Sequence, residues 1–307
     1  MTTATATAHD VRRWHRPLLV LTVAMAVLAA ATAVGIVADQ RILTGVPIWL
    51  KPFKFSISFV VYAVTLAWML SVLPRRSRLA EWAAVVIVGV AVVEMAIIVV
   101  QAARGTTSHY NETTPFNAAL WSAMGTSILV LFVCHLLIGV VALIQRIKDR
   151  PTAYAIRLGL GLSLLGMLAA IPMVNPAVAG SVGDDIVGAH SVGVPDGGPG
   201  LPLTGWSTVG GDLRIGHFVG LHALQALPLL GFLLARFLGG RYDSMTRARL
   251  LLVAGGAYGV LVLLLTWQAL RAEPLLHPGA PVVAAFAVLL AVTAAGVALV
   301  VRRPVTA

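Results

Sequence analysis

Long, continuous apolar runs are the feature that most constrains this chain. A helix needs about 20 mostly apolar residues to cross the hydrocarbon core of a bilayer. Eight segments of the 307-residue sequence meet that requirement, at roughly 17–38, 52–73, 79–103, 117–145, 153–174, 214–238, 247–270 and 280–301. Because the runs are continuous rather than alternating, membrane-spanning strands are excluded. We therefore predict an all-α polytopic membrane protein with eight transmembrane helices in an antiparallel bundle.

The composition supports the same class. Charged residues make up 11% of the chain and hydrophobic residues 59%, with a mean hydropathy of +0.91. An ordinary soluble domain has about 25% charged residues, so a soluble α/β enzyme is not expected. Intrinsic disorder needs low hydrophobicity and is excluded. The single cysteine, Cys134, excludes disulfides within the chain and Cys-based zinc sites.

Lysine and arginine predict the orientation. The net charge is +10, but the basic residues stand at the ends of apolar runs without interleaved aromatic residues, so we expect no nucleic-acid partner. With the N-terminus inside, 16 of the 22 basic residues fall on the cytoplasmic side. The positive-inside rule therefore predicts that both termini are cytoplasmic. The expected partners are the lipid bilayer and a small-molecule or lipid ligand, and the oligomeric state stays open.

The sequence predicts one membrane domain with short tails. Residues 1–16 are expected to form a disordered cytoplasmic tail, 17–303 the eight-helix domain, and 304–307 a second cytoplasmic tail. The outer loop 175–213 holds ten glycines and four prolines. A long loop of this kind is either functional or disordered. Because the loop ends with Trp206 and a charged pair, we favour an ordered lid over a flexible linker.

Polar residues that topology does not require gather in the outer half. Glu94 lies about nine residues below the outer end of its helix. Inserting a carboxylate into the bilayer at that depth costs roughly 2.5–3.5 kcal/mol. Glu94 marks either a functional site or a buried ion pair between helices. Lys54 and Tyr62 share a helix face, with a snorkelling lysine as the alternative. His135, deep in its apolar run, is interpreted as a helix-packing residue.

The segment 214–238 is the richest in polar residues. His222 and Gln225 are three residues apart and face similarly, whereas His217 and His222 are about 140° apart and cannot chelate one ion as an i, i+4 pair does. His217 is equally well explained as an interfacial residue. Gly216 and Gly220 form a small-xxx-small pattern that predicts close packing against another helix.

We expect these residues to line one pocket in the outer half, walled by the second, third, fourth and sixth helices. Glu94, His109 and His222 are the candidates for proton chemistry, because histidine carries protons near neutral pH and burial tunes a carboxyl group. The candidates for substrate binding are Lys54, Tyr62, Gln101, Arg104, Asn111, Trp206, Asp212, Arg214, His217 and Gln225. No metal ligands are assigned.

Three functions remain open. The first is an integral-membrane enzyme that acts by acid–base chemistry on an amphipathic small molecule or lipid, as an isomerase or lyase rather than a hydrolase. The second is a haem or metal protein. No cofactor is favoured, and haem b is the alternative. The third is a proton-coupled small-molecule transporter, against which the sequence shows neither an inverted repeat nor a broken helix pair. Motifs for zinc proteolysis, serine hydrolysis and nucleotide binding are absent.

Several stretches resemble a family of bacterial multi-pass membrane proteins without an assigned function: 49–55 (WLKPFKF), 104–111 (RGTTSHYN), 194–200 (VPDGGPG), 210–214 (GGDLR) and 221–225 (LHALQ). The resemblance spans about residues 39–230 and implies the bacterial inner membrane. The eight-helix plan and residues 134–137 (CHLL) also resemble haem A synthase, although the second helix here lacks a ligand histidine. In size and character the chain is similar to the membrane protein of valanimycin-type azoxy pathways, which implies a rearrangement in natural-product biosynthesis.

Overall fold

Helices account for most of the structure. The computed structural model describes residues 14–175 and 185–302, which form nine α-helices, one 3-10 helix and four two-residue strands. In chain order the elements are α1 (Arg16–Ala38), β1 (Ile42–Leu43), β2 (Val46–Pro47), α2 (Leu50–Val72), α3 (Arg78–Arg104), α4 (Pro115–Ile144), α5 (Arg150–Leu168), η2 (Ile171–Val174), β3 (Ser191–Val192), β4 (Gly211–Asp212), α7 (Arg214–Leu221), α8 (Ala223–Leu238), α9 (Ser244–Leu270) and α10 (Ala280–Arg302).

The predicted class, a helical polytopic bundle, is confirmed. Within the two described ranges, seven helical segments are long and apolar enough to cross a membrane: α1, α2, α3, α4, α5 with η2, α9 and α10. α7 and α8 reach that length only when they are taken together as one bent segment. The small antiparallel sheets β1–β2 and β3–β4, which the all-α prediction lacks, lie in connections between helices.

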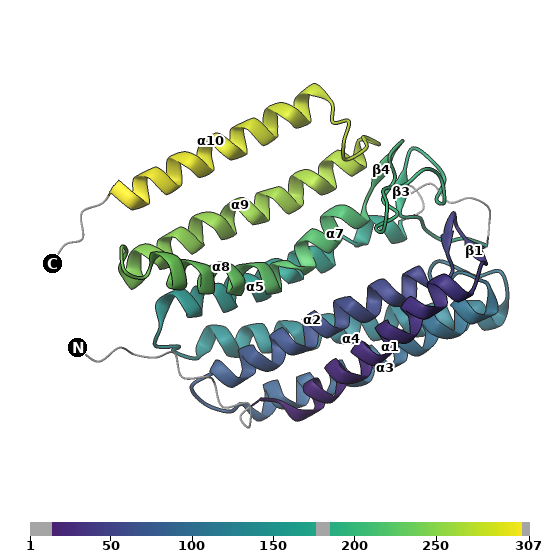
Figure 1. The fold of residues 1–307 in the computed structure, drawn as a ribbon, viewed down its shortest axis with the longest axis horizontal. Coiled ribbons are helices and arrows are strands. Elements are labelled where there is room, and N and C mark those ends of the chain that lie inside the picture. The colour runs from purple at the N-terminus through teal and green to yellow at the C-terminus, as the bar shows by residue number, and fades with distance from the viewer. Residues whose placement is uncertain (1–13, 176–184, 303–307) are drawn as a thin grey trace.

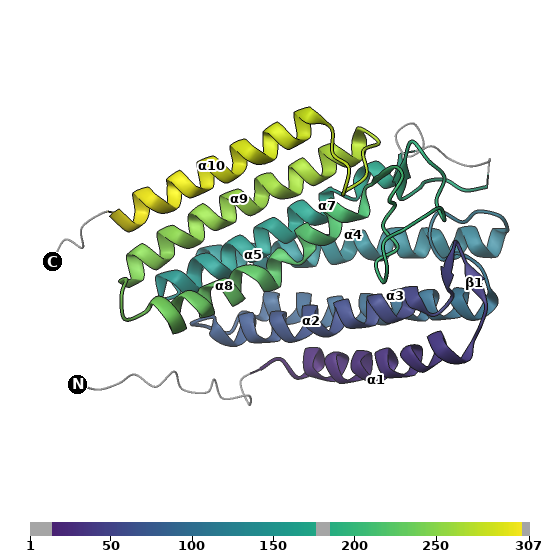
Figure 2. The same cartoon turned by 45° about the horizontal axis from the view of Figure 1, so that its top comes forward.

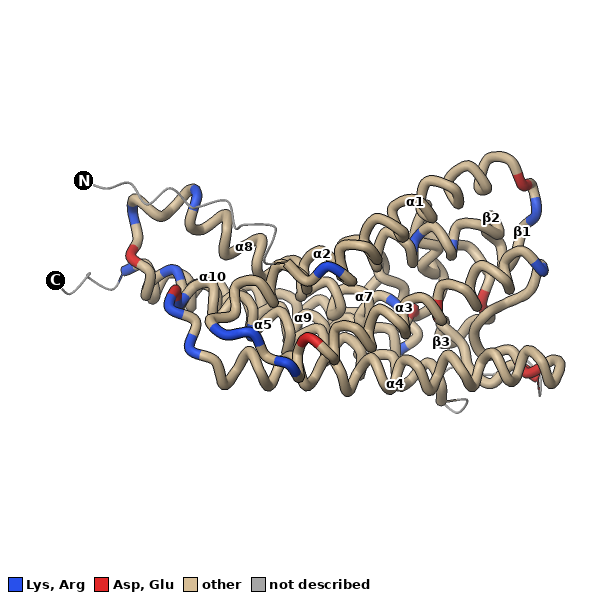
Figure 3. The backbone as a smooth tube through the Cα atoms, turned by 90° about the horizontal axis from the view of Figure 1, so that it is seen from below, with Lys and Arg blue, Asp and Glu red and all other residues tan. Residues whose placement is uncertain are grey.

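The helices run along a common direction and divide into two halves (Figures 1 and 2). α1, α2, α3 and α4 pack together in one half, and α5, α7, α8, α9 and α10 in the other, with α4–α5 and α2–α8 contacts between them. α1 begins and α10 ends at what we call the terminal end (Figure 1). The four strands lie at the opposite end, the loop end. Lys and Arg predominate at the terminal end, whereas both signs of charge occur at the loop end (Figure 3).

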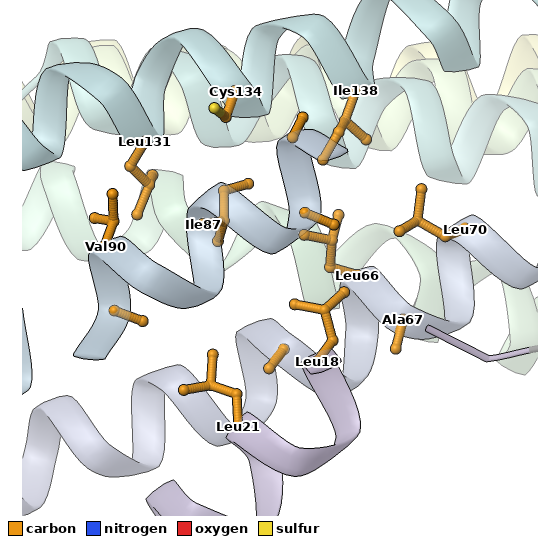
Figure 4. Packing of buried hydrophobic residues seen from close by; sticks show 14 of the residues in the cluster. Leu18, Leu21, Leu66, Ala67, Leu70, Ile87, Val90, Leu131, Cys134 and Ile138 are labelled. Carbon is orange, nitrogen blue, oxygen red and sulfur yellow. The ribbon is translucent and has the colours of Figure 1, made fainter. Parts of the chain in front are cut away.

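An apolar core holds the first half together. Leu18 of α1, Leu66 of α2, Ile87 of α3 and Ile138 of α4 are at most 1% exposed and point toward one another (Figure 4). Packing of this kind is a main driving force for helix association in lipid. α10 differs from these helices. Only 6% of its apolar stretch is buried inside the protein, and it packs mainly on α9.

Side-chain caps begin several helices where the sequence places a hydroxyl or carboxylate. Ser77 caps α3, Thr114 caps α4, Asp149 caps α5 and Asp243 caps α9, each accepting a backbone N–H three residues on. Such caps satisfy donors that the first helical turn leaves free. The caps therefore fix the residue at which each of these helices begins.

Parts of the predicted tails and lid lie outside the described residues: 1–13 of the first tail, 176–184 of the loop 175–213, and 303–307. The described end of the predicted tail 1–16 is built into the fold. His15 is 6% exposed, and its Nδ1 accepts the backbone N–H of Leu18 at 3.4 Å, which caps α1.

The segment 214–238, predicted as one helix, is divided. α7 and α8 meet at His222 with a bend of 45°. Pro228 lies inside α8. A proline lacks an N–H and its ring clashes with the carbonyl four residues earlier, here that of Leu224. Pro228 therefore interrupts the helical hydrogen bonding close to the break at His222.

Glycines bring α7 against α5 and α9, which confirms the predicted close packing of Gly216 and Gly220. A Cβ atom built on Gly216 would lie 2.2 Å from Oγ1 of Thr266 in α9. A Cβ atom on Gly220 would lie 2.4 Å from Cα of Gly166 in α5. The backbones of α5 and α7 therefore touch at Gly166 and Gly220, and no larger residue fits where these two helices cross.

We predict that Gly220→Ala destabilises the protein by about 1–3 kcal/mol, because the added methyl group forces α5 and α7 apart. Thermal unfolding of the purified protein in detergent measures the effect. The control is Gly161→Ala on α5, where a Cβ atom meets nothing within 4 Å. Equal unfolding temperatures for the two variants would contradict the close backbone contact of α5 and α7 at Gly220.

Candidate functional site

A cavity of about 470 Å³ lies at the loop end. It is walled by the β1–β2 hairpin, the first turn of α2, the last turns of α3, the loop 106–110, the described part of the predicted lid, and α7. The cavity therefore draws on both halves of the bundle. Its volume falls within the range of about 300–1,000 Å³ that is typical of small-molecule sites.

The described part of the predicted lid, 185–213, is tied to the body by backbone pairing. Asn111 and Ile186 form an isolated bridge, and the N–H of Glu112 donates to the carbonyl oxygen of Asp185 at 2.8 Å. Tyr110, in the left-handed region at φ 59°, places its ring 5.1 Å from that of His190. The loop 106–113 and this segment thus form one wall.

Two basic side chains, one on α2 and one on α7, hold the described part of the lid in place. Lys54 Nζ donates to the carbonyl oxygen of Thr204 at 2.7 Å. Arg214 donates through Nε and Nη2 to the two oxygens of Asp212 at 2.9 and 2.6 Å, and Nη2 also donates to the carbonyl oxygen of Gly205 at 2.6 Å. The Asp212 side chain is 0% exposed and also accepts the N–H of Ser207. The carboxylate of Asp212 is therefore buried and fully hydrogen-bonded, and Arg214 is partly buried.

Lys51 also lines the cavity, one helical turn before Phe55. Its Nζ lies 5.9 Å from the centre of the Phe55 ring. Among the residues that the structure describes, no carboxylate lies within 4.0 Å of either Lys51 or Lys54. Two ammonium groups therefore face the cavity without a direct ionic partner.

Three histidines line the same cavity, and neighbours fix the ring of two of them. Nδ1 of His217 lies 2.7 Å from the carbonyl oxygen of Gly166, and Nδ1 of His190 lies 2.6 Å from Oδ2 of Asp196. Because a carbonyl or an ionised carboxylate only accepts, each Nδ1 carries the proton. Each neutral imidazole keeps an unprotonated Nε2. A base oriented by a second group is the arrangement that acid–base catalysis uses.

Asp196 is a strong partner for His190. Burial disfavours its charge, but hydrogen bonds from the His190 ring and from the backbone N–H groups of His190 and Ser191 outweigh burial and hold the pKa of this carboxyl well below its usual range. Burial lowers the pKa of His190, and the hydrogen bond to Asp196 partly offsets that shift. The pair is thus an ionised carboxylate that orients a neutral imidazole.

His109 is the third histidine. Its ring lies 6.0 Å from Phe55 and 5.7 Å from Trp121, and Nδ1 lies 3.1 Å from Oγ of Ser108. Burial lowers the pKa of His109 well below its usual value, and the charge of Lys51 lowers it further. His109 is therefore neutral at physiological pH.

Four of the sequence-predicted site residues line this cavity: Lys54, His109, Arg214 and His217. Asp212 lies directly behind Arg214. Trp206 belongs to the same segment, where its carbonyl oxygen accepts the N–H of Leu201 at 2.8 Å.

Gln101, Arg104 and Asn111 form a separate polar cluster with Asn117 at the loop end. Asn117 Oδ1 accepts from Gln101 at 3.1 Å and from Arg104 at 3.0 Å, and Asn111 donates to Thr106 at 2.9 Å. None of these four side chains lines the cavity. The cluster joins the ends of α3 and α4 to the loop between them.

Tyr62 lies deeper, where its hydroxyl is 3.0 Å from Nδ1 of His135. Nε2 of His135 is 2.7 Å from Oγ of Ser163, so this chain links α2, α4 and α5. The ring of His135 is 0% exposed. The interpretation of His135 as a packing residue is confirmed by these contacts.

Glu94 and His222 lie one helical turn below the cavity. Glu94 is four residues before Ile98, and His222 is four residues after Phe218, and both of those apolar residues line the cavity. Glu94 is 2% exposed and bonded to Ser127 of α4. His222 stands at the break between α7 and α8, with Nδ1 3.1 Å from Oε1 of Gln225, whose amide lies 3.4 Å from the carbonyl oxygen of Val61.

Among the basic and acidic residues that line the cavity, three were not sequence-based candidates: Lys51, His190 and Asp196. One signal for Lys51 was available, because the chain has only three lysines and two of them lie in the stretch 49–55. His190 and Asp196 are six residues apart in a glycine-rich loop, a spacing that matches no regular element. Their pairing is set by the fold of that loop.

No family model matches the chain, and no curated protein or solved structure is significantly similar to it. Within residues 14–175 and 185–302, no three His, Cys, Asp or Glu side chains are grouped so that they could hold a metal ion.

We predict that the protein loses stability as the pH falls from about 7.5 to about 5, because an unfolded imidazole titrates near pH 6.5 whereas His109 and His190 resist protonation in the folded state. The unfolding temperature, measured across this range, should be flat above about pH 7 and decline below it. His109→Phe should make the decline shallower, whereas His277→Phe, at an exposed position, should not. If the unfolding temperature of His109→Phe fell with pH as steeply as that of the wild type, His109 would not be held neutral in the folded protein as described.

Proposed function

We propose that this protein is an integral-membrane enzyme that acts by side-chain acid–base chemistry on an amphipathic small molecule or lipid. The observation that carries the proposal is the cavity in which His190 and His217 each have Nδ1 anchored by an acceptor. Phe55, Phe218 and Ile98 supply apolar walls beside these polar groups. A pocket of this composition suits a molecule with a polar head and an apolar body.

The chemistry needs no co-reactant. One imidazole takes a proton from the bound molecule at Nε2 and, as the imidazolium, returns that same proton. Return to a second position of the molecule is an isomerisation, and transfer to a departing group is an elimination. Asp196 stabilises His190 when its ring becomes charged, as a carboxylate partner does for a catalytic histidine. The described part of the lid, held by Lys54 and Arg214, shields the cavity from bulk water.

We further propose that the protein crosses a bacterial inner membrane eight times, with α7 and α8 as one bent span and the loop end facing outward. The predominance of Lys and Arg at the terminal end supports this orientation. Both chain termini are then cytoplasmic, and the cavity opens within the outer half of the bilayer.

A second candidate function is proton-coupled transport of the same kind of molecule. The bend at His222 favours it, since discontinuous helices line the binding sites of many transporters. Glu94 and His222, one turn below the cavity, would then carry protons toward the terminal end.

Cysteine labelling tests the orientation. In a Cys134→Ser background we expect Leu276→Cys, exposed between α9 and α10, to react with a membrane-impermeant maleimide on intact cells. Lys148→Cys, exposed between α4 and α5, should react only after permeabilisation. The reverse pattern would invert the proposed topology.

A conversion assay tests the enzyme. Protein in nanodiscs is incubated in D2O with a bacterial small-molecule and lipid extract, which is then compared by mass spectrometry with a protein-free sample. We expect the wild type to introduce deuterium into a component or change its mass, because acid–base catalysis exchanges protons. His190→Gln and Asp196→Asn should slow the conversion by about 100-fold or more.

His277→Gln, at an exposed residue that does not line the cavity, is the matched control and should convert the same component at the wild-type rate. If the wild type changes no component beyond the protein-free sample, the enzyme proposal fails. If it instead moves a component across a proteoliposome membrane in response to a pH gradient, and Glu94→Gln stops this movement, the transporter takes its place.

A further inference from the structure

We propose that the cavity selects an anionic amphiphile, whose phosphate or carboxylate group binds between Lys51 and Lys54 while its apolar body lies against Phe55 and Phe218. The inference rests on the proposed function in that it uses the same cavity, and it names the class of molecule that enters. It concerns two lysines that take no part in the proton transfers themselves.

The charges at the cavity favour a negative partner. Lys51, Lys54 and Arg214 line it, against the two carboxylates Asp196 and Asp212. Asp212 is bonded to Arg214, and Asp196 accepts from His190 and from backbone N–H groups. With every histidine neutral, these five groups leave one positive charge at the cavity. Glu94 also attracts Lys51, but it lies one turn deeper, where it is hydrogen-bonded to Ser127. A partly buried ammonium group without a counterion is costly, and an anionic ligand removes that cost.

The two lysines are placed to hold one group. They are three residues apart on α2, and residues at this spacing are neighbours on one helix face. Lys54 donates one N–H to the neutral carbonyl of Thr204, and Lys51 donates none to any residue of the described chain. Since each ammonium has three donors, most of these N–H groups remain available to the oxygens of an anion.

The remaining wall is apolar and aromatic. The Phe55 and Phe218 rings are 6.4 Å apart in an edge-to-face arrangement, and Ile98 and Met173 also line the cavity. A free inorganic anion would leave these surfaces without a partner, whereas an alkyl or isoprenoid chain would cover them. A neutral or zwitterionic headgroup would leave the positive charge uncompensated.

Calorimetric titration of the wild-type protein in phosphatidylcholine nanodiscs tests the inference, with octyl phosphate as the probe and octyl glucoside as its neutral counterpart. We expect octyl phosphate alone to bind. The double variant Lys51→Gln/Lys54→Gln should weaken binding by about 30-fold or more, because it removes both partners of a desolvated charge. Lys148→Gln, at the terminal end, should bind as the wild type does.

Lys51→Arg/Lys54→Arg keeps the charge and should retain binding, which separates loss of charge from loss of fold. Octyl phosphate binding no tighter than octyl glucoside, or binding unchanged in the glutamine variant, would overturn the inference. In nanodiscs that mix phosphatidylglycerol with phosphatidylcholine, one retained phosphatidylglycerol per protein in native mass spectrometry identifies a bilayer lipid as the source. Binding of octyl phosphate without such retention identifies a free small molecule.

The two proposals fail in different ways. Loss of all conversion in the extract assay, with octyl phosphate still bound through the lysines, would overturn the enzyme and leave the anionic ligand. Conversion of a neutral component at a rate that Lys51→Gln/Lys54→Gln does not change would overturn the anionic ligand and leave the enzyme.

Discussion

In hydrocarbon there is no water to satisfy a polar group, so each one must find its partner inside the protein. Many polar side chains of the described helices follow this rule. Tyr62, His135 and Ser163 pair with one another in the middle of the bundle, and Gln101 and Asn117 pair near its loop end. Lys51 departs from the rule in the described structure, and it does so at the surface of the cavity. Oε1 of Gln268 in α9 is also buried without a partner among the described residues, but Gln268 does not line the cavity. The ammonium group of Lys51 does line it, and a ligand can meet it there.

The site depends on the contact between α5 and α7. Because Gly166 and Gly220 have no side chains, their backbones touch, and the carbonyl oxygen of Gly166 reaches Nδ1 of His217. The same crossing therefore packs two helices and sets the tautomer of an imidazole. Arg214, at the first residue of α7, is fixed by the buried carboxylate of Asp212. Helix packing and the chemistry of the cavity are set by the same backbone.

The sequence predicts the helices and the polar loop end because hydropathy and helical periodicity are local signals. It correctly predicts that Gly216 and Gly220 pack closely, and it places Lys54, His109, Arg214 and His217 among the candidate residues. It does not separate Glu94 and His222, one turn deeper, from the cavity, since depth along a helix is uncertain by about a turn. The pairing of His190 with Asp196 depends on how a glycine-rich loop folds over helices far away in sequence. Local patterns contain no information of that kind.

The slight burial of α10 bears on how the protein is made. This helix packs mainly on α9, and none of the cavity walls belongs to it. During synthesis every residue that walls the cavity therefore emerges before α10 does. Docking of α10 then adds an apolar, largely uncovered helix beside α9 and changes none of the cavity walls.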